Sequence, residues 1–165
     1  MIRRTMLVAI VGLVALGIGL IGNALATTAS GFTVETARGP LVDRPLDVNW
    51  NFAPGNKVKL QTQGVVEVAA QRIVIAPGGT LGWHSHPGPT VVTIQSGTMS
   101  FYHAEDCTME MEYEAGDSFS NLPDEIHMAR NESSVTPLVV YASYFVPAGA
   151  PLRIDQPSPG PDCPQ

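Results

Sequence analysis

Short β-rich runs separated by turn residues fill the chain from residue 58 onward. The chain has 16 glycines and 14 prolines, and after the N-terminal segment they are too dense to sustain the 3.6-residue periodicity of an amphipathic helix. The strands that this pattern predicts lie at 65–76, 90–95, 98–103, 118–122, 127–130 and 138–146. No internal repeat indicates a solenoid. We therefore expect an all-β sandwich or barrel, because closure removes sheet edges that invite aggregation.

Three details of this pattern carry further expectations. Pro77-Gly78-Gly79 reads as a turn that ends the first strand. The run 138–146 is apolar at nearly every position, which predicts a strand buried on both faces. An acidic segment, whose spacing matches no Ca²⁺-binding loop, is expected to be a solvated hairpin tip. Its acidic residues are Glu105, Asp106, Glu110, Glu112 and Glu114.

The N-terminus has the pattern of a bacterial-type signal peptide. Arg3 and Arg4 are followed by an uncharged apolar run at 6–22 and by the A-x-A cleavage signal Ala24-Leu25-Ala26. We expect residues 1–26 to direct export to the periplasm, the cell envelope or the medium. The apolar run is long for a signal and short for a membrane span, so an uncleaved anchor is the alternative.

The rest of the chain is long enough for one domain with a single core. We expect an N-terminal arm with one strand over 27–54, where Gly, Pro, Asn and Asp are frequent. A barrel follows over 55–148, and a Pro-rich tail over 149–165.

The charge balance excludes several classes of partner. Without residues 1–26 the chain keeps seven basic and fifteen acidic side chains, a formal charge of −8. It has no basic cluster and few aromatic residues, so nucleic acid and anionic lipid headgroups are poor partners. We expect a small-molecule ligand or substrate, and no membrane contact beyond an N-terminal anchor.

Cys107 and Cys163 are the two cysteines of the chain. In an exported protein they are expected to form a disulfide, with two free thiols as the alternative. The bond would close a loop of about 57 residues and stabilise the fold by about 4 kcal/mol on the chain-entropy model. No C-x-x-C motif indicates a redox role.

Three of the four histidines are spaced as metal ligands. His84 and His86 project to the same side of a strand, because side-chain direction repeats every second residue. His127, on a neighbouring antiparallel strand, would complete one face of a coordination sphere and leave positions open for water, oxygen or substrate. Imidazole ligands suit divalent Zn, Cu, Fe and Ni.

These residues resemble the first motif of the cupins, small jelly-roll β-barrels of which many hold a metal. The motif is G-(x)5-H-x-H-(x)3,4-E-(x)6-G, and this chain keeps every spacing. Its five positions are Gly78, His84, His86, Thr90 and Gly97. Thr90 stands where the family usually has a glutamate ligand.

The second cupin motif, G-(x)5-P-x-G-(x)2-H-(x)3-N, is also present in altered form. Gly116, His127 and Asn131 lie at its intervals. Leu122 replaces the proline and Asp124 the glycine, with a proline between them. The run Gly-Trp-His-Ser-His-Pro-Gly-Pro further resembles small exported bacterial cupins.

The resemblance covers residues 55–148 and implies one cupin-type barrel with a divalent metal (Fe, Mn, Ni, Zn or Cu) held by His84, His86 and His127. Thr90 or a water would take the fourth position. Three-histidine centres in some cupin-like dioxygenases hold Fe(II), which implies oxygen chemistry. Cupins often dimerise, so a homodimer stays open.

Other side chains have expected places around this centre. The parity of the strands predicts a cavity wall made by Val92, Ile94, Met99 and Phe101. Trp83 projects to the opposite face from the ligands and is expected to pack. His103, at a strand end, is expected on the rim rather than as a fourth ligand.

The sequence thus predicts a metal-dependent oxidoreductase, dioxygenase-like, acting on a small molecule. No residue stands out as a general base, so no catalytic residue is assigned. The alternative is a non-catalytic module of the cell envelope that binds a metal or senses a small ligand. A third reading is a structural barrel whose histidines hydrogen-bond one another.

Overall fold

The computed structural model describes residues 26–42 and 45–165. The signal or anchor expected at 1–26 lies outside this part of the chain, apart from Ala26. Within the described ranges no helix has the length and apolar character needed to cross a membrane.

Every regular element in these ranges is a β-strand, as the sequence predicts. The strands are β1 (Ser30–Pro40), β2 (Asp47–Ala53), β3 (Asn56–Gln61), β4 (Val66–Thr80), β5 (His84–Ser85), β6 (Thr90–Ser96), β7 (Thr98–His103), β8 (Met109–Glu114), β9 (Ser118–Asn121), β10 (His127–Arg130), β11 (Leu138–Pro147) and β12 (Ile154–Asp155).

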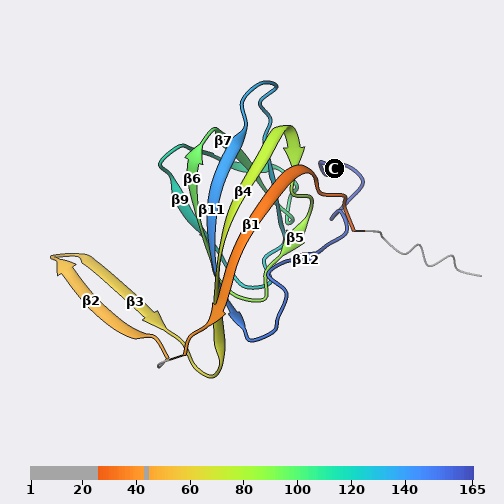
Figure 1. Ribbon diagram of the computed structural model, residues 1–165. Helices are drawn as coiled ribbons and strands as arrows, with labels where there is room; N and C mark the ends of the chain where they lie inside the picture. The colour runs from red at the N-terminus through yellow and green to blue at the C-terminus, as the bar shows by residue number, and fades with distance from the viewer. Residues whose placement is uncertain (1–25, 43–44) are drawn as a thin grey trace, which may run out of the picture.

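Most of these strands form one antiparallel sheet that curls into a nearly closed barrel of the jelly-roll type (Figure 1). Its main path is β12-β5-β10-β4-β11-β6-β9; β1 also pairs with β4, and β7 joins β10 to β8. The barrel therefore brings the short strands β5 and β10 together, although some forty residues separate them in the chain.

The core fills the inside of this barrel with side chains from alternate positions of the long strands. On β11 the buried positions are Leu138, Val140, Ala142, Tyr144 and Val146. The expectation that β11 is buried on both faces is wrong: Tyr141, between these positions, is 47 % exposed. Only the inner face of a single-layered barrel wall is covered, whatever the apolar content of the outer positions.

Two further expectations need correction. Strand β4 does not end at Pro77 but continues to Thr80, and Gly78 takes a φ of 72° within it. The backbone N–H of Gly78 donates to the carbonyl oxygen of Asn131, and the N–H of Asn131 donates to the carbonyl oxygen of Gly79, both at 3.0 Å. These hydrogen bonds keep the segment in the sheet. Three of the five acidic residues expected in a hairpin tip lie instead in a strand, because Met109–Glu114 forms β8 and pairs with β7.

Asn131, the last residue of the second motif, is a structural residue. Its side chain is buried, and Nδ2 donates to the carbonyl oxygens of Ile75 at 3.0 Å and Thr136 at 2.8 Å. It thereby holds the segment after β10 against β4.

The expected arm contributes more than one strand. β1 runs along β4 over ten register positions and sends Phe32 against the core. β2 and β3 form a separate hairpin that projects from the barrel (Figure 1). The boundary expected at residue 54 falls in the turn of this hairpin. The barrel sheet begins before that boundary, because β1 pairs with β4.

The Pro-rich tail is fastened to the barrel. Cys107 and Cys163 form the expected disulfide, with their Cα atoms 5.0 Å apart. Trp83 packs as expected, fully buried beside Met128 and Cys163, and its Nε1 donates to the carbonyl oxygen of Pro164 at 2.8 Å. The tail thus passes close to β5, the strand that carries two of the histidines.

Candidate metal centre

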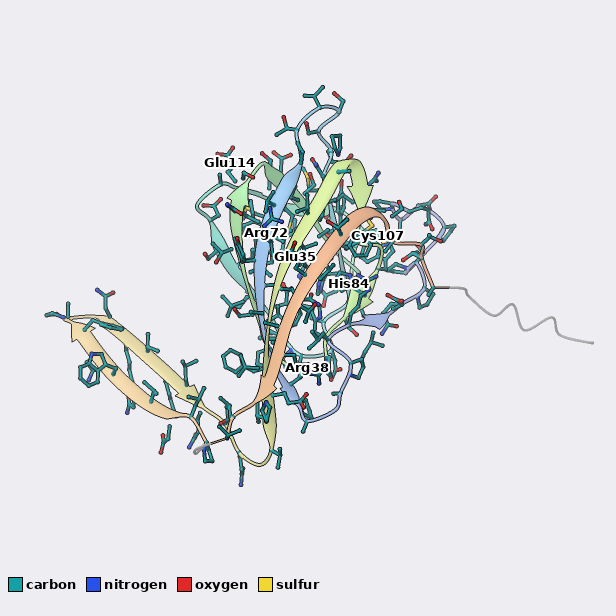
Figure 2. All side chains as sticks on the ribbon, in the orientation of Figure 1. Glu35, Arg38, Arg72, His84, Cys107 and Glu114 are labelled. Carbon is teal, nitrogen blue, oxygen red and sulfur yellow. A yellow bond between two sulfur atoms is a disulfide. The ribbon has the colours of Figure 1, made fainter. Side chains whose placement is uncertain are left out.

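The three motif histidines meet inside the barrel. β5 pairs with β10 so that His84 lies directly opposite His127, and His86 follows two residues after His84. The ring centroids of the three lie 4.4 to 5.1 Å apart. One ring nitrogen from each lies within 4.8 Å of the others, so the group could hold a metal ion. Figure 2 labels His84, which lies on β5.

Backbone carbonyl groups set the orientation of all three rings. The three bonds are His84 Nδ1 to Gly82 O at 2.9 Å, His86 Nδ1 to Leu152 O at 2.7 Å and His127 Nδ1 to Glu125 O at 3.0 Å. Because a carbonyl oxygen only accepts, each Nδ1 carries the hydrogen and donates it. Each Nε2 therefore keeps its lone pair for a ligand, the arrangement that metal-binding histidines use.

The environment keeps these imidazoles neutral. Burial is the main cause that lowers the pKa of His127 to about 3 and the pKa of His84 well below its usual value; charge repulsion between the rings adds to it. Burial also lowers the pKa of His86. Neutral imidazole is the form that binds a metal ion.

Thr90 lies beside the rings at the start of β6. Its side chain is 1 % exposed, and Oγ1 has no hydrogen-bond partner. A buried hydroxyl without a partner is costly unless a water or ligand satisfies it. Together with three inward lone pairs, this orphaned hydroxyl fits a metal with a bound water at the fourth position, the role that the cupin resemblance implies for Thr90.

The rings and Thr90 share a cavity of about 30 Å³. Val92, Met99 and Phe101 line it, as the sequence predicts. Ile94, two residues after Val92 on β6, does not line the cavity and is buried in the apolar core. No Asp or Glu is among the lining residues, so the protein supplies no negative charge there.

Two of the cavity residues that sequence reasoning missed carry polar side chains. Asn121 on β9 is buried, and its Nδ2 lies 3.4 Å from His127 Nε2. Tyr144 on β11 lies 5.4 Å from the His86 ring and donates its hydroxyl to Gln71 at 2.8 Å; burial raises its pKa to about 12. The inward parity of β11 could have identified Tyr144, whereas Asn121 has no such signal.

His103 is a rim residue, as expected. It is partly exposed, and its Nε2 lies 3.1 Å from Glu110 and 3.0 Å from Glu125. It does not join the group formed by the other three histidines. Glu125 is bound at both ends, since its carbonyl accepts from His127 while its carboxylate meets His103.

Residues 71–144 match the family model described as the cupin domain. No protein with curated annotation matches the chain.

Solved structures also resemble this chain. A double-stranded β-helix protein from Klebsiella pneumoniae is 18 % identical over 70 % of this chain and 82 % of its own, with a TM-score of 0.46. A cupin-like protein from Thermotoga maritima is 18 % identical over 61 % and 82 %, with a TM-score of 0.48. An oxalate oxidase bound to the substrate analogue glycolate is 22 % identical over 53 % and 45 %, with a TM-score of 0.44.

Proposed function

We infer that this chain, a member of the cupin superfamily through residues 71–144, binds one divalent transition metal with His84, His86 and His127. One observation carries the proposal: three buried rings, each held by a backbone carbonyl at Nδ1, direct their Nε2 lone pairs into one cavity. Fe, Ni, Zn and Cu all suit such ligands. With no carboxylate among the ligands, the ion keeps its full positive charge at the site.

The activity that fits this centre best is oxidation of a small molecule by dioxygen, of the dioxygenase type. A bound metal would supply electron transfer and Lewis-acid chemistry. The protein holds the His127 ligand in place, because the Phe101 ring stacks on the His127 ring with their centroids 5.0 Å apart. The apolar side chains that line the cavity exclude bulk water. Apart from the three ligands, no lining residue is an acid or base suited to proton transfer near neutral pH, which favours metal-centred redox chemistry.

We also propose that the protein works outside the cytosol, in the periplasm, the cell envelope or the medium. The Cys107–Cys163 disulfide supports this, since such bonds persist in oxidising compartments.

One observation favours a second candidate, a non-catalytic module that holds a metal or a small ligand. The cavity of about 30 Å³ has room for only two or so water-sized groups. A larger substrate would need the barrel mouth to open.

Oxygen uptake separates the two candidates. The full chain, loaded with Fe(II) or with Zn(II), is incubated with a metabolite extract, beside the His84→Ala/His127→Ala variant. If only the Fe(II)-loaded wild type consumes oxygen, and a defined metabolite disappears from the extract, the result supports the oxidase. No uptake and no altered metabolite, with a ligand retained, supports the binding module.

A further inference from the structure

The hairpin of β2 and β3 carries an exposed apolar face. In its register Val48 lies opposite Leu60. Trp50 lies opposite Val58, two positions nearer the turn, so both pairs project from the same side of the hairpin. Phe52 follows two residues after Trp50 on β2. We call these five side chains the apolar face.

This apolar face is large for a surface that meets only water. Trp50 is 61 % and Phe52 65 % exposed, which is about 100–150 Å² for each aromatic side chain. Val48, Val58 and Leu60 are 37 to 43 % exposed and bring the total to about 400–500 Å². A contiguous apolar patch of this size marks an interaction surface.

The hairpin has little support from the rest of the described chain. Among the described residues, β2 and β3 pair only with each other, and the hairpin projects from the barrel (Figure 1). An isolated two-stranded hairpin is marginally stable at best in water, and packing of its apolar side stabilises it. The apolar face therefore needs a partner.

A groove of about 370 Å³ opens where the hairpin joins the barrel. Leu60 belongs both to the apolar face and to the lining of this groove. None of the described lining residues is charged. The other apolar side chains that the groove presents include Val65, Pro87, Pro89, Phe145 and Pro147. The base of the hairpin thus carries an apolar recess, and the part near its turn carries two exposed aromatic rings.

We propose that this surface is the interface of a homodimer, in which the hairpin of each copy lies in the groove of the other. A two-fold axis stacks two hairpins antiparallel, so that the turn end of one meets the base of its partner. Trp50 and Phe52 of each copy then enter the partner's groove. Burial of both apolar faces removes about 800–1,000 Å² from water, and the two grooves bring the total above the roughly 1,000 Å² that a specific interface needs.

Charge favours a second copy over an anionic lipid surface. Lys57 and Lys59, the only lysines of the chain, lie on the opposite side of the hairpin from the apolar face. Together with Asp47 they give the hairpin a formal charge of +1. The other residues from 27 onward include five basic and fourteen acidic side chains, a charge of −9. The hairpin is therefore attracted to the barrel of another copy, whereas anionic lipid would repel that barrel.

Photo-crosslinking in the full chain maps the interface directly. Benzoylphenylalanine replaces Trp50 or, as a matched control, Tyr141, an exposed aromatic residue on the barrel wall. Mixing isotope-labelled with unlabelled protein distinguishes crosslinks between copies from those within one copy. We expect the probe at position 50 to crosslink the second copy within residues 60–66 or 87–89, and the probe at position 141 not to do so. Position-50 crosslinks that lie only within one copy, or elsewhere on the second copy, overturn the proposal.

Sedimentation of full-chain variants measures the strength of the dimer. All variants share residues 1–26, so a difference between them reports the substituted surface. Trp50→Ser/Phe52→Ser should raise the dimer dissociation constant by about a hundredfold or more, since each substitution acts twice in a symmetric dimer. Val65→Asp, which puts a charge into the groove and leaves the hairpin intact, should also dissociate the dimer. Val135→Ser, at a residue that is 79 % exposed elsewhere on the surface, is the control and should match the wild type.

Three results would overturn the proposal, with circular dichroism confirming that each variant is folded. A wild type that is monomeric at every concentration measured excludes the dimer. A Val65→Asp variant that dimerises like the wild type excludes the groove as the seat of the hairpin. A monomeric wild type that pellets with phosphatidylcholine vesicles, while Trp50→Ser/Phe52→Ser does not, assigns the apolar face to a lipid surface instead.

Discussion

The Nδ1 atom of His86 donates a 2.7 Å hydrogen bond to the carbonyl oxygen of Leu152. His86 belongs to the barrel, whereas Leu152 lies in the tail, outside the region that matches the cupin family. One of the three proposed metal ligands is therefore oriented by a segment that the barrel motifs do not include.

Removal of the tail should weaken metal binding. A chain that ends at Ala150 loses the carbonyl partner of His86, and outer-shell partners of this kind affect metal affinity by about tenfold to a hundredfold. Metal titration of the shortened and full chains measures the change, with circular dichroism as the check on β-structure. A folded, shortened chain with full metal affinity would show that Leu152 does not orient the ligand.

Loss of the disulfide should lower stability. Cys107→Ser/Cys163→Ser opens a loop with a sequence separation of 56. The free energy of unfolding should fall by about 2–4 kcal/mol, as measured by urea denaturation. An unchanged urea midpoint would contradict the prediction. Oxidised and reduced wild type provide the matched comparison without any substitution.

Thr90→Val should stabilise the metal-free protein. The substitution removes a buried hydroxyl that has no partner, at nearly constant volume, and relief of such a group is worth about 1–3 kcal/mol. In the metal-loaded protein a bound water would satisfy the hydroxyl, so the gain should disappear. Thermal unfolding with and without metal measures both effects; an equal gain in both states would contradict the role given to Thr90.

Acid should destabilise the metal-free protein. His127 has a folded pKa of about 3, and His84 also lies well below the usual 6.5, so the unfolded chain binds protons that the folded chain does not. Their contribution to stability is complete above pH 6.5 and is lost as the pH falls toward 3. Urea unfolding in chelator across this range measures the loss. In the His84→Asn/His127→Asn variant the free energy of unfolding should depend less steeply on pH. An equally steep dependence in that variant would rule out these histidines as its cause.

The sequence predicted the barrel and the histidine group because both follow from local rules. Strand parity and the His84-Ser85-His86 spacing place two ligands on one face, and the second motif supplies His127. The predictions were wrong where packing against residues distant in the chain determines the position of a residue. Nothing local shows that Ile94 lies beyond the cavity or that Pro77 stays within a strand.

The contribution of the tail was beyond local reasoning for a related cause. Leu152 acts through a backbone carbonyl, which any residue has, so the sequence gives no sign of its role. Only the disulfide indicated that the tail returns to the barrel.

The metal content of protein purified without an affinity tag tests the central claim most directly. Elemental analysis compares the wild type with His84→Ala/His127→Ala, after both have been checked for folding. We predict roughly one transition-metal ion per wild-type chain and almost none in the variant. The same negligible metal content in both, even after incubation with Fe(II), Mn(II), Ni(II), Zn(II) and Cu(II), would contradict the metal centre.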